Sequence, residues 1–137
     1  MKKINSKTLK IIPAVSYFWL IWFLSSHEIP IDISSSDKIL HTIEYSVMGL
    51  FLSYGIINAD DFNRTGEIFV FFASLTGAID EIHQAFVPGR TASFADFAVD
   101  ILGCAIGLTF FIIFSKFIKN CKSFIHNLYH PENKSII

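Results

Sequence analysis

The chain alternates long apolar stretches with short polar ones, and four such stretches follow one another within its 137 residues. Each is close to the length that a helix needs to cross the hydrocarbon core of a bilayer. The third is the shortest, because its charge-free run covers only residues 68–79, a length more common in buried helices of soluble proteins. We predict an all-α integral membrane protein, a four-helix bundle in a single domain, with a basic cytoplasmic tail at residues 119–137. The predicted helices cover residues 8–25, 38–57, 67–86 and 94–118.

The composition supports a lipid environment. Hydrophobic residues make up 52% of the chain and include fifteen phenylalanines, more than a soluble core of this size could bury. The net charge of −1 gives no basic footprint for nucleic acid, which is therefore not an expected partner. Cys104 and Cys121 lack the spacing of a disulfide framework or a thiolate metal site, so both are expected to be free thiols.

The distribution of basic residues predicts the orientation of the helices, because an excess of lysine and arginine marks the cytoplasmic side. Between the predicted helices there are only Lys38, Arg64 and Arg90. Both termini are therefore predicted to be cytoplasmic, with the first and third connections on the outer side. The lysines that flank the first and last helices are Lys2, Lys3, Lys7, Lys10, Lys116, Lys119 and Lys122.

Ionisable side chains gather at the outer ends of the predicted helices. Helical spacing gives each helix one polar stripe there, and small residues such as Gly103 and Gly107 continue the stripes inward. Small residues allow membrane helices to approach closely, so the polar faces are expected to meet in the bundle. The polar residues at this level are Asp37, Lys38, His41, Glu44, Tyr45, Asp80, Glu81, His83, Gln84, Asp96 and Asp100.

The pair Asp80-Glu81 is the strongest indication of chemistry. Two adjacent carboxylates inside an apolar segment repel each other unless they share a cation, a proton or a hydrogen-bond donor. The pair therefore suits acid/base catalysis or metal binding. His41 and His83, each taken alone, are more typical of packed, hydrogen-bonded histidines.

Other polar residues have a structural interpretation beside the functional one. Ser93 and Asp96 fit the capping box of a helix, and Asp37 fits an N-cap or a first-turn acid. The pair Pro88-Gly89 fits the centre of a type II turn.

Together these residues resemble the signature of the VanZ-like family, bacterial membrane proteins named for a member that raises resistance to the glycopeptide antibiotic teicoplanin. Its elements here are D-K-x-x-H with a tyrosine four residues on, G-x-x-D-E-x-x-Q-x-F-V-P-G-R, and S-x-x-D-x-x-x-D-x-x-G. The middle element is specific, because an acid pair, a glutamine and a P-G-R turn rarely occur at this spacing by chance. The matching residues are Asp37, Lys38, His41, Tyr45, Gly77, Asp80, Glu81, Gln84, Phe86, Val87, Pro88, Gly89, Arg90, Ser93, Asp96, Asp100 and Gly103.

The resemblance implies a location in the bacterial cell membrane, a multi-pass architecture and a connection to glycopeptide tolerance or cell-envelope chemistry. It implies no particular reaction. The chain departs from the family pattern at Asp100, where the family usually carries asparagine. An asparagine amide donates a hydrogen bond, whereas Asp100 could do so only when protonated, so no role is carried over to it.

We predict an acidic polar pocket on the outer side that binds or processes the polar head of a membrane lipid or a lipid-linked envelope molecule. The candidate catalytic residues are Asp80, Glu81 and His41. A divalent cation is a candidate cofactor, with Asp80, Glu81 and Asp96 as candidate ligands. Six acids against two bases at this level leave a net charge of −4 with histidine neutral, so a phosphate would need a bridging cation or protonated acids. The predicted substrate-binding residues are Lys38, Tyr45, Gln84, Arg90 and Asp96.

Other classes of function stay open from the sequence, and so does the question of whether the chain is an enzyme. One alternative is a carboxylate- or metal-dependent hydrolase or transferase acting on a lipid-linked substrate. Another is a non-catalytic structural or partner-binding membrane protein, including a homo-oligomer formed through Gly103 and Gly107. Transport is less favoured, because no ionisable residue lies between Glu67 and Asp80 to continue a path.

Overall fold

The structure, a computed structural model, consists of four α-helices and contains no strand among the residues that it describes. These are residues 6–26, 34–58 and 61–129, and the side chains of residues 6–8 and 34–37 lie outside the description. The prediction of an all-α chain with four helices is confirmed. The helices are α1 (Ser6–Ser25), α2 (Ser34–Ile56), α3 (Phe62–Gln84) and α4 (Phe94–Tyr129).

All four helices are longer than the apolar pattern predicts, and the largest differences are at the start of α3 and the end of α4. Helix α3 begins at Phe62 instead of residue 67, because polar residues form its exposed first turn and Thr65 donates a hydrogen bond of 2.6 Å to the Asp61 carbonyl. Helix α4 continues to Tyr129 instead of ending at residue 118, and no proline or glycine interrupts residues 119–129. Much of the predicted tail is therefore helical.

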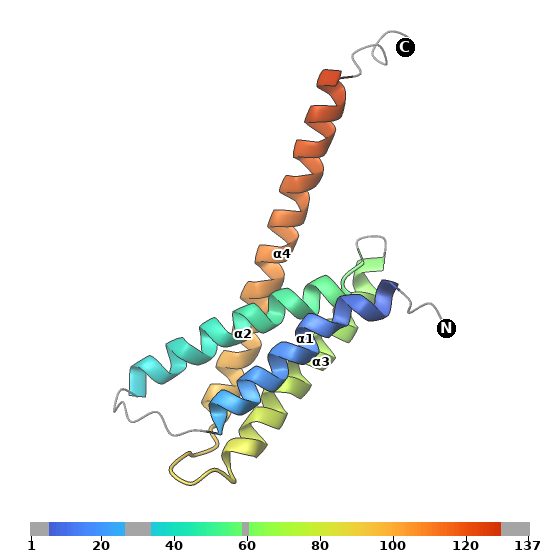
Figure 1. The fold of residues 1–137 in the computed structure, drawn as a ribbon. Coiled ribbons are helices and arrows are strands. Elements are labelled where there is room, and N and C mark those ends of the chain that lie inside the picture. The colour runs from blue at the N-terminus through green and yellow to red at the C-terminus, as the bar shows by residue number, and fades with distance from the viewer. Residues whose placement is uncertain (1–5, 27–33, 59–60, 130–137) are drawn as a thin grey trace.

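The helices form a bundle from which one helix extends. Helices α1 and α3 run side by side, α2 packs chiefly against α4, and the second half of α4 reaches well beyond the other three (Figure 1). The last turns of α1 and α3, the first half of α2 and the first turns of α4 lie at the same end of the bundle. The fold thus brings residues from four distant parts of the chain to one place.

Glycines set the distance between α2 and α4. A Cβ added at Gly107 would collide with the Ser46 backbone and lie 2.7 Å from the Leu50 nitrogen, and one added at Gly103 would lie 2.8 Å from the Thr42 carbonyl. The predicted role of these small residues in close helix packing is confirmed. Helix α2 covers this face of α4, so a homo-oligomer, which stays a prediction, would have to use a different face.

Large apolar side chains cover much of the outer surface. Trp19 on α1, Phe71 on α3 and Phe114 on α4 are each more than 60% exposed. By length and composition, α4 is the one described helix that could cross a membrane, and Leu9–Ser25 is a shorter apolar stretch. Extensive exposed apolar surface is typical of proteins that face lipid or a partner.

Candidate functional site

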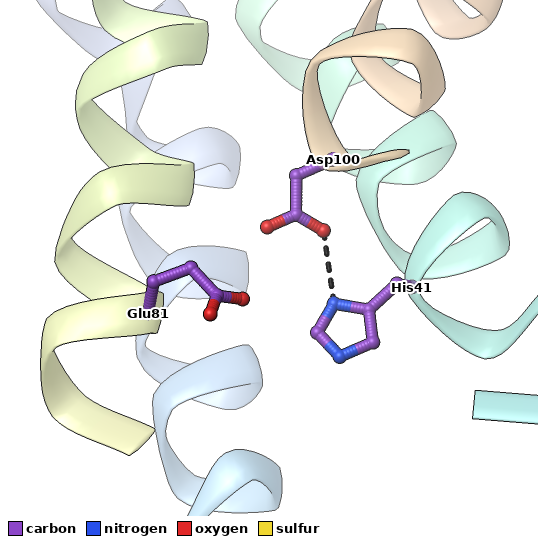
Figure 2. A group of neighbouring side chains, drawn as sticks. All are labelled: His41, Glu81 and Asp100. Carbon is purple, nitrogen blue, oxygen red and sulfur yellow. Dashed lines mark hydrogen bonds and ion pairs between the residues drawn. The ribbon is translucent and has the colours of Figure 1, made fainter. Parts of the chain in front are cut away.

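Three ionisable side chains from three helices point toward one another at one end of the bundle. They are His41 of α2, Glu81 of α3 and Asp100 of α4 (Figure 2). All three are buried. One ring nitrogen of His41, one carboxylate oxygen of Glu81 and one of Asp100 lie within 4.8 Å of one another. We call these residues the acid–histidine cluster.

His41 and Asp100 form the paired half of the acid–histidine cluster. The Nδ1 atom of His41 lies 2.9 Å from Oδ1 of Asp100, a hydrogen bond between two side chains that are almost fully buried (Figure 2). Tyr45 lies nearly parallel to the imidazole at 6.5 Å between ring centroids, and its hydroxyl donates to the Thr76 carbonyl at 3.3 Å. The bond to Asp100 orients the imidazole, and the bond to Thr76 holds Tyr45 beside it.

Glu81 is held by the backbone at the start of α4. The Ser93 N–H donates to Oε2 of Glu81 at 2.6 Å. In a complete capping box this N–H would bond to the side chain of Asp96, so the predicted capping box is only half formed. Ser93 does cap the helix, because its hydroxyl oxygen accepts from the N–H groups of Ala95 and Asp96 at 3.2 and 3.4 Å.

Asp80 lies beside the acid–histidine cluster and is bound within its own helix. The Gln84 amide donates to Oδ2 of Asp80 at 2.9 Å, and both side chains are buried. Electrostatic interactions also link Asp80 to Glu81 and Asp100. The pair Asp80-Glu81 therefore lies close to the third carboxyl group, and the three acidic side chains share one small volume.

Each of these three carboxylates has one bonded oxygen and one unbonded oxygen. The unbonded ones are Oδ1 of Asp80, Oε1 of Glu81 and Oδ2 of Asp100, all buried and without a hydrogen-bond partner among the described residues. A buried carboxylate oxygen is costly unless a proton, a donor or a cation neutralises it. The arrangement can therefore accept a proton, bind a cation or position a donor group of a ligand.

The structure places the other predicted site residues differently. Tyr45 and Gln84 line the cluster as described above, whereas Lys38 is exposed and Arg90 is half-buried in the α3–α4 connection. That connection contains the predicted turn, because Gly89 has a φ of 81° and the Arg90 N–H donates to the Val87 carbonyl at 3.1 Å. The side chain of Asp37 lies outside the described residues.

The three residues whose nitrogen and oxygen atoms lie close enough to share a metal ion differ from the predicted ligands Asp80, Glu81 and Asp96. Only Glu81 is common to both groups, because His41 and Asp100 take the other two places. Asp96 is half-buried, one helical turn before Asp100. The sequence contained a signal for Asp100, since it continues the Asp96 stripe of α4, but the departure from the family pattern led to its omission.

His83 has a structural place in the fold. Its ring stacks on Trp22 of α1 with 3.8 Å between centroids, and its Nε2 lies 2.9 Å from the Ser26 hydroxyl. These contacts join the ends of α1 and α3. They agree with the interpretation of His83 as a packed, hydrogen-bonded histidine.

A shallow pocket opens the cluster to the surroundings. It has a volume of about 320 Å³, and its walls include Glu81, Ser93 and the apolar side chains Ile82, Phe94 and Phe97. A larger pocket of about 680 Å³ lies at the opposite end of the bundle, between α4 and the α2–α3 turn, where Lys116 and Lys119 line it. Of these two pockets between described residues, the smaller one includes a member of the acid–histidine cluster, Glu81.

The comparisons with known proteins agree with the sequence signature. The model of the VanZ/LLP1 family matches residues 2–115 of the chain. The searches of curated proteins and of solved structures return no match. The matched range contains α1, α2 and α3 in full and α4 as far as residue 115, so it includes every residue of the acid–histidine cluster.

Proposed function

The chain belongs to the VanZ/LLP1 family of membrane proteins, and we propose that it binds the polar head of a membrane lipid or lipid-linked envelope molecule at its acid–histidine cluster. The observation that carries this proposal is the set of buried carboxylate oxygens of Asp80, Glu81 and Asp100 that have no partner among the described residues. Such oxygens are retained at a cost, and a ligand that donates hydrogen bonds or positive charge would offset it.

We propose that the protein passes through the bacterial cell membrane several times, with both termini in the cytoplasm. The exposed lysines Lys116, Lys119 and Lys122 follow the apolar part of α4 and support this orientation. The acid–histidine cluster then lies on the outer side, at the level of lipid head groups. An envelope amphiphile would reach it from the bilayer without crossing water.

The shallow pocket beside Glu81 is the proposed route by which an envelope amphiphile reaches the acid–histidine cluster. Its apolar lining residues Ile82, Phe94 and Phe97 suit an acyl or prenyl chain, and its polar lining residues Glu81 and Ser93 suit a head group. We propose that occupation of this pocket underlies a role in teicoplanin tolerance, the role that the family resemblance implies.

A second candidate function is catalytic. His41 bonded to Asp100 beside the carboxylate of Glu81 offers groups that can take up and release a proton, as a hydrolase or transferase acting on a lipid-linked substrate requires. Mass spectrometry of envelope lipids from cells with and without the protein separates the two functions, because binding changes the lipids that copurify and catalysis also changes the lipid pool.

Isosteric variants test the binding site. Asp80→Asn and Glu81→Gln keep the shape of the side chains and remove one charge each, so we expect teicoplanin tolerance and lipid copurification to fall to the level seen in cells that lack the protein. Tolerance is measured as the minimum inhibitory concentration in a sensitive host. Glu67→Gln is the matched control, since it makes the same change at an exposed position at the opposite end of α3.

Two results would contradict the proposal. Unchanged tolerance and lipid binding in both variants would remove the cluster from the function. Loss of the folded variants from the membrane, with Glu67→Gln unaffected, would instead assign the cluster a purely structural role.

A further inference from the structure

The buried carboxylates of the cluster share one pattern of bonding. Gln84 bonds one oxygen of Asp80, the Ser93 N–H bonds one oxygen of Glu81, and His41 bonds one oxygen of Asp100. The second oxygen of each carboxylate is buried and has no hydrogen-bond partner among the described residues. None of these three side chains is more than 7% exposed. The free oxygens have almost no accessible surface, so bulk solvent reaches them poorly.

The charges within this group do not balance. Three ionised carboxylates carry three negative charges, and His41 can supply at most one positive charge. A buried group with a net charge near −2 is unfavourable in a poorly solvated interior. One divalent cation would neutralise it, whereas protonation would have to neutralise two separate carboxyl groups.

The geometry accommodates such an ion. One possible metal-ligand atom from each of His41, Glu81 and Asp100 lies within 4.8 Å of those of the other two, and the three side chains point toward one another (Figure 2). Two ligands of the same ion, bound at about 2.0–2.4 Å, lie at most about 4.8 Å apart. The free oxygens of Glu81 and Asp100 belong to the two carboxylates that flank this space.

We propose that His41, Glu81 and Asp100 bind one divalent transition-metal ion, with Asp80 adding negative charge beside it. One imidazole nitrogen and two carboxylate oxygens suit Zn²⁺ or Mn²⁺, whereas Mg²⁺ and Ca²⁺ prefer sites made of oxygen alone. The three ligands come from α2, α3 and α4, so the ion would also join three helices at one end of the bundle.

The ion would remove the main electrostatic obstacle to a phosphate head group. An acidic cluster repels phosphate, and a bound cation would attract it and occupy the oxygens that otherwise lack partners. The identity of this ligand rests on the proposed function. The metal site itself does not, because it is tested on the purified protein without any lipid substrate.

Metal content of the full-length protein tests the site. Protein purified in detergent is stripped with EDTA, incubated with Zn²⁺ or Mn²⁺, desalted and measured by inductively coupled plasma mass spectrometry. We expect about one ion per chain, together with a rise in the thermal unfolding temperature on reloading because the ion binds only the folded state. A wild-type protein that keeps neither ion and shows no change in unfolding temperature would overturn the inference.

Three variants locate the ion. Glu81→Gln and Asp100→Asn are expected to weaken retention by tenfold or more, the order of effect known for changes at metal sites, and to abolish the rise in unfolding temperature. Glu67→Gln removes the same charge at the far end of α3 and should keep the ion. Equal metal content in all three variants would overturn the assignment. Metal loss that leaves lipid copurification intact in Glu81→Gln would support the ion site and contradict its link to the head group.

Discussion

His41 and Asp100 depend on each other because both are buried. Their hydrogen bond of 2.9 Å joins side chains that have almost no contact with solvent, and it ties α2 to α4. Removing one member of a buried pair leaves the other as an uncompensated polar or charged group, which costs more than the pair itself contributes. The pair is therefore a sensitive point of the fold, whatever the bundle binds.

We expect His41→Ala to lower the free energy of unfolding by about 3 kcal/mol, because it leaves the Asp100 carboxylate without its imidazole partner. The measurement is unfolding in detergent with EDTA present, which separates the pair from any bound ion. Asp100→Asn in the His41→Ala background should cost clearly less than Asp100→Asn in the wild type, since the charge it removes has already lost its partner. Additive costs would show that the two residues are not coupled.

At the scale of elements, the contact between α2 and α4 explains how a chain with few large buried side chains holds together. Backbones approach closely where Gly49 and Gly107 face the opposite helix, and the hydroxyls of Ser46 and Ser53 bond back to carbonyls of their own helix at 2.6 Å. Bonded in this way, the hydroxyls need no partner across the interface. The close contact also sets how near Asp100 lies to His41.

Gly107→Ala tests this contact. The new methyl group would meet the backbone of α2, which cannot move aside as a flexible side chain would, so we expect a loss of about 2 kcal/mol or more in unfolding free energy. Gly66→Ala is the matched control, because nothing lies within 4 Å of its added Cβ. In α3 this control should be neutral or stabilise by up to about 1 kcal/mol through helix propensity. Similar losses in both variants would contradict the close contact.

At the scale of the whole molecule, the sequence was sufficient for the features that depend on local pattern. Apolar length and periodicity predict four helices, the spacing of Pro88 and Gly89 predicts the turn between α3 and α4, and small residues predict close packing around Gly103. Each of these depends on residues near one another in the chain. The extension of α4 to Tyr129 was missed, because charge ends a membrane span without ending a helix.

The membership of the cluster could be predicted only in part. Asp80, Glu81, His41 and Gln84 stood out as polar residues in apolar segments, but which of them face one another depends on how the helices rotate and cross. The bond from the Ser93 N–H to Glu81 joins residues on two helices and replaces a local capping bond. No spacing rule along the chain indicates that exchange. The bond between Asp100 and His41 spans 59 positions and is equally invisible to local pattern.

The orientation of the whole molecule makes a final prediction, and the chain carries its own probe. Cys121 lies about 40 Å along α4 from Phe94 at 1.5 Å per residue, farther than the roughly 30 Å of hydrocarbon in a bilayer. With the α3–α4 connection outside, Cys121 must then reach the cytoplasmic side. Cys104 is fully buried and should react on neither side.

A membrane-impermeant maleimide added to intact cells should therefore leave the wild-type protein unlabelled and label Cys121 once the cells are permeabilised. A variant that combines Cys121→Ser with Thr91→Cys, at an exposed position in the α3–α4 connection, should label in intact cells. Cys121→Ser alone serves as the control for reaction at Cys104. Labelling of Cys121 in intact cells, with Thr91→Cys protected until permeabilisation, would mean that the acid–histidine cluster faces the cytoplasm, and the proposed ligand would then have to be found among the lipids of the inner leaflet.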